Sequence, residues 1–119
     1  LSIKLVKKGI RVNAVAPGYV ASSGMDSYPP EMGPVLRNAM QGVPLQRMAS
    51  EAEVSAAIVF LLSEAASFIT GTVLRVDGGR PQMRAGWSAG LAKSDRPAVQ
   101  PYDGFPLARL PKVLQKGED

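Results

Sequence analysis

The chain has 119 residues, of which 45% are hydrophobic and 20% are charged, a composition that is ordinary for one globular domain. It contains no cysteine and no histidine, which excludes disulfides, thiol chemistry, a Ser-His-Asp triad and any histidine-based metal site. The net charge of +4 gathers in residues 1–30 and 80–119 without one basic stripe, and no apolar run could span a bilayer, so we expect neither a nucleic-acid nor a membrane partner.

The first predicted elements are a helix end and a strand. Residues 1–8 mix apolar and lysine side chains and stop at Gly9, as the last turns of a helix do. Because the sequence begins inside this helical pattern, we expect a fragment of a longer protein. Residues 10–16 are β-branched and nearly all apolar, which predicts a strand covered on both faces. Pro17-Gly18 ends the strand, since proline lacks a ladder donor.

Two helices are predicted after a loop at residues 19–28. Pro29-Pro30 opens the first, and its apolar positions follow helical spacing. Those positions are Met32, Val35, Leu36, Ala39, Met40 and Val43. Residues 44–49 predict a linker, and Ser50 with Glu53 predicts a capping box that starts the second helix. Its expected apolar stripe comprises Val54, Ala57, Ile58, Leu61 and Leu62.

The last regular element is a strand at residues 72–76, which follows a turn at 67–71 and is closed by Asp77-Gly78-Gly79. Residues 80–119 hold half of the ten prolines and irregular apolar spacing, which predicts an extended tail, either disordered or wrapped over a neighbouring surface. Partial docking of this tail is indicated by its large apolar residues Trp87, Tyr102, Phe105 and Leu110. We therefore divide the chain into a domain part, 1–79, and a tail, 80–119.

Both strands are short apolar runs that end in small-residue turns. A parallel strand presents such a turn at the ligand edge of an α/β sheet. The predicted fold class is therefore α/β, the C-terminal part of a doubly wound parallel-sheet (Rossmann-like) fold with two parallel strands, helices and an irregular tail. Asn13 is predicted to act as a polar lock, meaning that hydrogen bonds from its side-chain amide fix the geometry at the start of the strand. Asp77 is predicted to accept a hydrogen bond from the backbone of its own turn.

Several motifs in residues 1–79 resemble those of the short-chain dehydrogenase/reductase family. Residues 13–22 resemble the family stretch Asn-x-(aliphatic)-x-Pro-Gly-x-(Val/Ile)-x-Thr, with Ser22 in place of threonine. Residues 44–53 resemble its Pro-Leu-x-Arg link, although the usual proline after the cap is absent. Residues 67–71 resemble its Ser-x-(Phe/Tyr)-(Ile/Val)-Thr-Gly lead-in, and residues 76–79 its Val-Asp-Gly-Gly ending.

The resemblance implies where NAD or NADP would bind. In the family, the loop that matches Pro17 and Gly18 packs on the nicotinamide ring. The residue matching Val20 binds the carboxamide through its backbone, and the hydroxyl matching Ser22 reaches the carboxamide or the pyrophosphate. Residues 23–43 match the family's substrate loop, in which Met25, Tyr28 and Met32 are the candidate contacts to an apolar or acyl-type substrate, while Val35, Leu36 and Ala39 are expected to pack in the core.

Other family motifs do not occur in the sequence. It lacks the Gly-rich Thr-Gly-x-x-x-Gly-x-Gly turn that holds the pyrophosphate, and the catalytic Ser and Tyr-x-x-x-Lys would precede Leu1. We therefore assign no catalytic residue and no metal ligand. The resemblance implies that the parent is a cytoplasmic, homo-oligomeric NAD(P)-dependent oxidoreductase that interconverts an alcohol and a carbonyl or reduces an activated alkene, and that this chain alone is inactive. The alternative is a non-catalytic interaction module that docks on another chain.

Overall fold

The computed structural model describes residues 1–80 and 110–115. It combines helices with parallel strands, as the sequence predicts for an α/β chain. In chain order they are α1 (Ser2–Val6), β1 (Ala14–Pro17), β2 (Val20–Ala21), the 3-10 helix η1 (Ser23–Ser27), α2 (Met32–Met40), β3 (Ala49–Ser50), α3 (Glu51–Leu62), the 3-10 helix η2 (Glu64–Ala66), β4 (Val73–Val76) and the 3-10 helix η5 (Lys112–Leu114).

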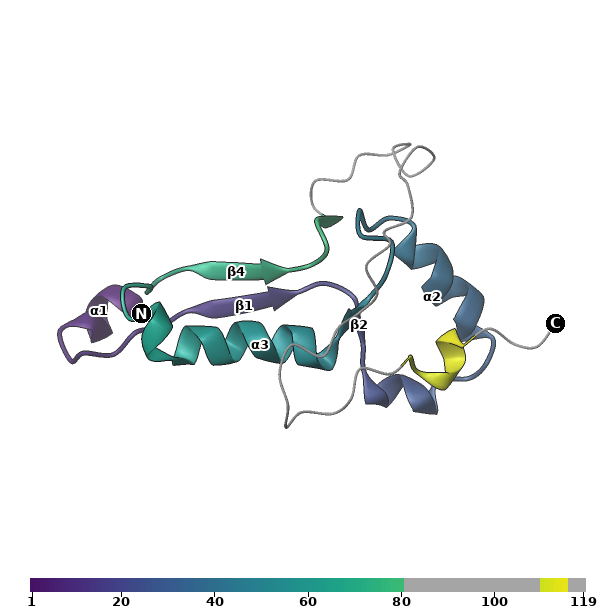
Figure 1. Cartoon of the computed structure of the whole chain (residues 1–119), viewed down its shortest axis with the longest axis horizontal. Helices are drawn as coiled ribbons and strands as arrows, with labels where there is room; N and C mark the ends of the chain where they lie inside the picture. Colours follow the sequence, from purple (N-terminus) through teal and green to yellow (C-terminus); the bar gives the residue numbers. More distant parts are fainter. Residues whose placement is uncertain (81–109, 116–119) are drawn as a thin grey trace.

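The predicted parallel pairing of the two main strands is confirmed. β1 pairs with β4 in parallel, with Ala14 opposite Val73 and Pro17 opposite Val76. Figure 1 shows the two strands side by side and pointing the same way. The Gly18 N–H continues the ladder by donating to the Val76 carbonyl at 2.9 Å. Both strands therefore deliver their terminal turns to the same edge of the sheet.

The predicted polar lock at Asn13 is confirmed, but the strand itself begins at Ala14 instead of residue 10. The Asn13 amide donates from Nδ2 to the Ile69 carbonyl at 3.0 Å. Its Oδ1 accepts from the Thr72 N–H at 3.1 Å. Backbone bonds flank these side-chain bonds, since the Gly71 N–H donates to the Val12 carbonyl at 2.8 Å and the Ala14 N–H donates to the Thr72 carbonyl at 2.9 Å. Asn13 thus adds to the pairing of the two segments before the strand begins.

Arg11 fixes the end of α3 to the start of β1. Its guanidinium donates from Nη1 to the carbonyls of Leu61 at 2.8 Å and Ile69 at 3.2 Å. Its Nη2 donates to the Ser63 carbonyl at 3.3 Å. The last carbonyls of a helix lack partners within the helix, so this cation satisfies them and opposes the negative end of the dipole.

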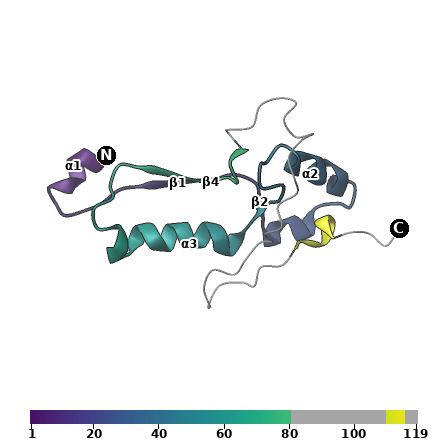
Figure 2. The ribbon, with the colours of Figure 1, turned by 45° about the horizontal axis from the view of Figure 1, so that its top comes forward.

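α3 lies along one face of the β1–β4 pair, as the turned view makes clear (Figure 2). The predicted capping box that starts it is confirmed: the Glu53 N–H donates to Ser50 Oγ at 3.1 Å, and the Ser50 N–H donates to Glu53 Oε2 at 2.8 Å. The predicted apolar stripe is only partly right, because Leu61 is buried while Ile58 and Leu62 are 43% and 77% exposed. Two short strands cover too little of the helix to bury the whole stripe.

Two segments predicted as loop and linker contain secondary structure. β2 pairs with β3 in parallel, with Val20 opposite Ala49 and Ala21 opposite Ser50. η1 follows β2 directly. A two-residue strand has no periodicity, and a 3-10 turn of glycine, serine and aspartate has no apolar pattern, so neither could be predicted from the sequence.

The helix predicted from Pro29-Pro30 begins at Met32, and Val35 on it is 60% exposed, so the expectation that Val35 packs in the core was wrong. In the tail, Trp87, Tyr102 and Phe105 lie outside the described residues, and Leu110 is 48% exposed. Within the described tail residues 110–115, Lys112–Leu114 form η5, and Leu114 is buried. Within the described ranges, no helix is long and apolar enough to cross a membrane.

Candidate functional site

The turns after β1 and β4 press against each other at the carboxyl edge of the sheet. A Cβ atom placed on Gly18 would lie 2.9 Å from the Cα of Asp77 and 3.0 Å from its Cβ. Real Cβ atoms essentially never approach another atom below 3.0 Å, so only glycine fits at this position. The Pro17-Gly18 turn therefore rests directly on the turn that follows β4.

Asp77 stabilises its own turn, as the sequence predicts. Its Oδ1 accepts from the Gly79 N–H at 3.0 Å, and Gly78 and Gly79 both adopt positive φ. Its Oδ2 lies 3.8 Å from Nε of the half-exposed Arg75. The carboxylate shapes the surface under Gly18, and nothing in this arrangement gives it the role of a catalytic acid.

The four residues predicted to bind cofactor occupy one continuous loop at this edge. Pro17 is exposed, and Gly18, Val20 and Ser22 are partly exposed. The Val20 carbonyl accepts from the Ser22 N–H at 2.9 Å, which bends the chain where β2 meets η1. Ser22 is the N-cap residue of η1, yet its hydroxyl makes no capping hydrogen bond to that helix. The hydroxyl is thus not committed to the cap.

A pocket of about 130 Å³ adjoins this loop. It lies between the turn after β4 and the segment that leads into β3. Its lining residues are Tyr19, Val43, Leu45, Arg47, Ala49, Glu53, Val76, Asp77 and Gly78. None of the four predicted cofactor residues lines it. Tyr19, which no pattern in the sequence marks as a pocket residue, lines it, and the Arg80 guanidinium lies 4.9 Å from its ring centroid.

Arg47 and Glu53, which both line this pocket, form a bidentate ion pair. Arg47 Nη1 and Nη2 donate to the two Glu53 carboxylate oxygens at 2.8 and 2.7 Å. Their side chains are 25% and 17% exposed, so the pair is partly shielded from water. Arg47 Nη1 also donates to the Met48 carbonyl. The ion pair holds the 44–49 segment against the start of α3. Arg47 and Glu53 are six residues apart, a spacing that matches no helical repeat, so the pair could not be predicted from the sequence.

The predicted substrate contacts separate into buried and exposed positions. Met25 is only 9% exposed and packs with Met48 and Leu114 in a buried cluster. Tyr28 is 43% exposed, and Met32 is partly buried. Met25 is thus part of the packing beneath η1, whereas Tyr28 offers its ring to solvent.

A carboxylate of α3 anchors the start of η1. Glu51 Oε1 accepts from the Ser23 N–H at 3.0 Å and from the Ser23 hydroxyl at 3.2 Å. This bond connects the loop that carries Ser22 to the helix under the sheet. No local pattern predicts this bond, because Ser23 and Glu51 are 28 residues apart.

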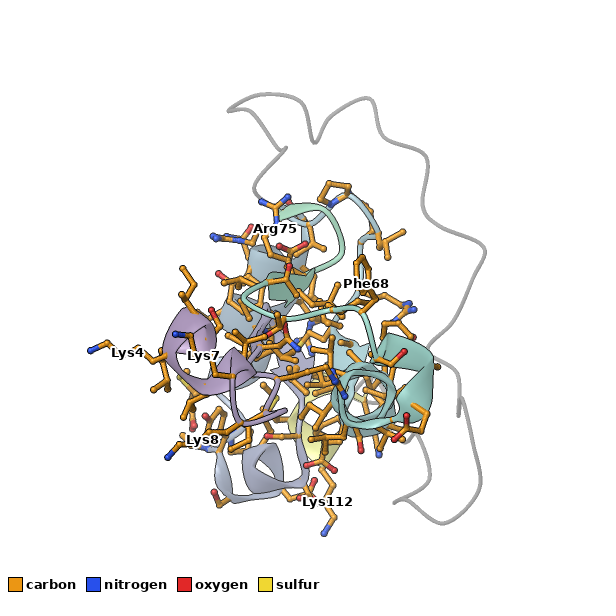
Figure 3. All side chains as sticks on the ribbon, turned by 90° about the vertical axis from the view of Figure 1, so that its left-hand side faces the viewer. Lys4, Lys7, Lys8, Phe68, Arg75 and Lys112 are labelled. Carbon is orange, nitrogen blue, oxygen red and sulfur yellow. The ribbon has the colours of Figure 1, made fainter. Side chains whose placement is uncertain are left out.

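Other charged and apolar groups are remote from the loop. Figure 3 shows the lysines of the first turns, Lys4 and Lys8, extending outward, and Phe68 is fully exposed at the far end of the sheet. In residues 1–80 and 110–115, no three acidic side chains gather in a way that could hold a metal ion.

Comparisons with known proteins agree with this geometry. Residues 1–80 match the profile of a family described as enoyl-(acyl carrier protein) reductase. The chain is 40% identical over 79 residues to galactitol 2-dehydrogenase (L-tagatose-forming) of Cereibacter sphaeroides, which covers 66% of this chain and 31% of the relative. It is 43% identical over 79 residues, with the same coverage, to the uncharacterized oxidoreductase YmfI of Bacillus subtilis strain 168.

Solved structures show the same likeness. The fold is similar to that of YwfH, an NADPH-dependent reductase involved in bacilysin biosynthesis, with a TM-score of 0.57 and 32% sequence identity. That match covers 66% of this chain and 33% of YwfH. The chain spans about a third of the length of the curated relatives it matches.

Proposed function

The chain belongs to the short-chain dehydrogenase/reductase family, and on that basis we propose that it forms the nicotinamide-side part of an NAD(P)-dependent oxidoreductase. The proposed enzyme interconverts an alcohol and a carbonyl, or reduces an activated alkene, on a small molecule. The observation that carries the proposal is the parallel β1–β4 pairing, which brings the Pro17-Gly18 turn to the sheet edge where α/β folds bind ligands.

The residues of the loop fit a nicotinamide ring. The side of Gly18 on which a Cβ would stand faces Asp77, so the other side of the loop carries no side chain at this position and a flat ring can approach the backbone there. The Ser22 hydroxyl can donate to a carboxamide oxygen, and the Val20 backbone lies close by, since its carbonyl accepts from the Ser22 N–H. NAD or NADP bound here would supply or accept the hydride.

For the substrate we propose an apolar or acyl-type small molecule. Its support is the methionine-rich packing of η1 and α2, which offers an adaptable apolar wall. We propose that Tyr28 and Met32 contact an apolar or acyl-type substrate and that Met25 supports them from beneath. Closure of this segment over the reacting atoms would exclude water. We further propose that the enzyme is a cytoplasmic homo-oligomer.

The 119-residue chain by itself is proposed to be inactive. Its sequence has no Gly-rich turn for the pyrophosphate and offers no matched catalytic Tyr-x-x-x-Lys. A fluorescence titration of the purified chain with NADPH and NADH tests this directly. We expect no saturable binding; tight binding of either nucleotide would contradict the proposal.

The function is tested in the full protein that carries this chain. Reduction of carbonyl compounds and oxidation of alcohols are followed by nicotinamide absorbance, and Ser22→Ala is compared with Ser67→Ala. Ser67 is exposed and lies at the opposite end of the sheet, so it serves as the matched control. We expect Ser22→Ala alone to raise the KM for the cofactor, by about tenfold for one lost hydrogen bond. Equal cofactor KM values in both variants would contradict the role of Ser22.

One observation favours the second candidate, a non-catalytic interaction module. A groove of about 490 Å³ between β1 and α3 is lined by apolar residues that include Val12, Val15 and Ile58. Ile3 and Leu62 are 84% and 77% exposed. Exposed apolar surfaces of this kind are usually buried against other protein. If the chain is part of an enzyme, the rest of the same polypeptide would cover them; if it is an interaction module, another chain would. A Gly-rich turn and Tyr-x-x-x-Lys encoded upstream in the same frame would support the enzyme, whereas a stop codon followed by a start codon just before Leu1 would support the module.

A further inference from the structure

Residues 110–115, here named the strap, dock on two helical segments far away in the sequence. The Lys112 N–H donates to Asp26 Oδ1 in η1 at 3.1 Å, across 86 residues. Arg37 Nη1 in α2 donates to the Val113 carbonyl at 3.4 Å, across 76 residues. Figure 1 shows η5, in yellow, beside both segments. The strap therefore joins η1 to α2, and these two elements together are named the lid.

An apolar anchor accompanies these hydrogen bonds. Leu114 is 4% exposed and packs with Met25 of η1 and with Met48. Tyr19 and Ala21, the residues on either side of Val20, pack against the same cluster. Leu114 thus connects the lid to the loop that carries Val20 and Ser22.

A glycine in α2 makes room for the strap. Gly33 is buried in the first turn of α2, and a Cβ placed on it would lie 2.7 Å from the Val113 carbonyl oxygen. That oxygen belongs to backbone, so the strap would have to move. Glycine is a weaker helix former than alanine. Glycine at position 33 thus lowers the helix propensity of α2, and it allows the Val113 carbonyl to lie against the helix, which a residue with a Cβ would prevent.

We propose that the strap is a latch that holds the lid against the 18–21 loop, with Leu114 as the positioning residue. Docked, it fixes the segment that carries Tyr28 and Met32 and so sets the position of the substrate wall. The part that concerns substrate rests on the proposed function, whereas the docking of strap on lid does not. The contacts described above join the strap to the lid and its cluster, so its release should loosen the lid and leave the β1–β4 pairing intact.

Hydrogen exchange measured by mass spectrometry on the full protein tests the latch. Leu114→Ala removes the anchor, and Gly33→Ala displaces the Val113 carbonyl. We expect both to speed amide exchange in η1 and α2 by about tenfold or more, while β1 and β4 keep their protection. For Gly33→Ala this is opposite to the effect of helix propensity alone, which would slow exchange in α2.

Two matched variants serve as controls. Lys112→Ala keeps the backbone N–H and removes a side chain that extends into solvent (Figure 3). Gly42→Ala adds a Cβ after the end of α2, 3.5 Å from the Ala39 carbonyl oxygen, which is an ordinary contact. Neither should change exchange in the lid. Unchanged lid exchange in Leu114→Ala and Gly33→Ala, or equal acceleration in β1 and β4, would overturn the latch.

Steady-state kinetics on the same proteins separates the latch from the proposed function. We expect Leu114→Ala and Gly33→Ala to raise the substrate KM about tenfold and to change kcat less, while Lys112→Ala leaves both unchanged. Faster lid exchange with an unchanged KM would overturn the link between latch and substrate. Absence of oxidoreductase activity in the unsubstituted protein would contradict the proposed function and the link to substrate, while the exchange results would still decide the docking of strap on lid.

Discussion

Substitution of Gly18 by alanine perturbs the contact on which the candidate site is built. The new Cβ would lie 2.9 Å from the Asp77 Cα and 3.4 Å from the Asp77 carbonyl oxygen. Carbon atoms in good contact are ~3.5–4.0 Å apart, so the two turns must separate by roughly half an ångström. Such overpacking typically costs about 1–3 kcal/mol of unfolding free energy. We expect Gly18→Ala to lose that amount in urea denaturation of the full protein.

The same displacement should weaken catalysis, because the loop that would hold the nicotinamide moves with Gly18. Misplacement approaching 1 Å can lower kcat/KM by up to about a hundredfold, so a loss of about tenfold is expected here. Shortening Asp77 should not rescue the variant, since the nearest atom is the Asp77 Cα. Gly24→Ala is the stability control, because its Cβ would meet only Ser22 Oγ at 3.6 Å. Unfolding free energy within 0.5 kcal/mol of the unsubstituted protein, roughly the spread of neutral substitutions, together with unchanged kcat/KM would refute this reasoning.

Three further substitutions test the scaffold, each by urea denaturation against Ser67→Ala. Asn13→Ala removes the bonds to Ile69 and Thr72 and should lower the unfolding free energy by about 1–3 kcal/mol; a loss below ~0.5 kcal/mol would contradict the lock. Ser50→Ala removes the helix cap and should cost about 1 kcal/mol, and a neutral result would show that the capping box adds nothing. Arg11→Lys keeps the charge but replaces the two donor nitrogens of the guanidinium with a single ammonium nitrogen, so we expect a loss of about 1–2 kcal/mol; equal stability would show that charge alone suffices.

The elements with strong local signals were predictable from the sequence. The capping box at Ser50 and Glu53, the amide lock at Asn13 and the turn carboxylate of Asp77 each depend on neighbours within a few residues or on the chemistry of one side chain. The parallel pairing of β1 and β4 was also predictable, because a helix separates two short apolar runs that end in similar turns.

Interactions between distant segments could not be predicted in this way. The Arg11 clamp, the Glu51 bond to Ser23 and the docking of Leu114 each join residues that share no periodicity. Exposure also differed from the pattern: Leu62 belongs to the apolar stripe of α3, yet it is 77% exposed. The apolar pattern of a helix predicts which side chains form its packing face. Whether each of them is buried depends on the segments that pack against that face.

In the candidate site, the sequence located the loop but not its surroundings. Pro17, Gly18, Val20 and Ser22 lie together at the sheet edge. Tyr19, which lines the adjoining pocket and packs against the buried cluster, was missed. Successive residues of an extended chain point to opposite sides, so a side chain at position 19 is expected on the side opposite to that of Val20. This is the one sequence signal that could have indicated a separate role for Tyr19.

The most direct measurement is a crystal structure of the full protein with bound NAD(H) or NADP(H). We expect the carboxamide of the nicotinamide within about 2.7–3.2 Å of the Val20 backbone and the Ser22 hydroxyl, with the ring over the Pro17-Gly18 turn. A dinucleotide whose nicotinamide lies away from this turn would contradict the assignment of the loop, even in an active oxidoreductase.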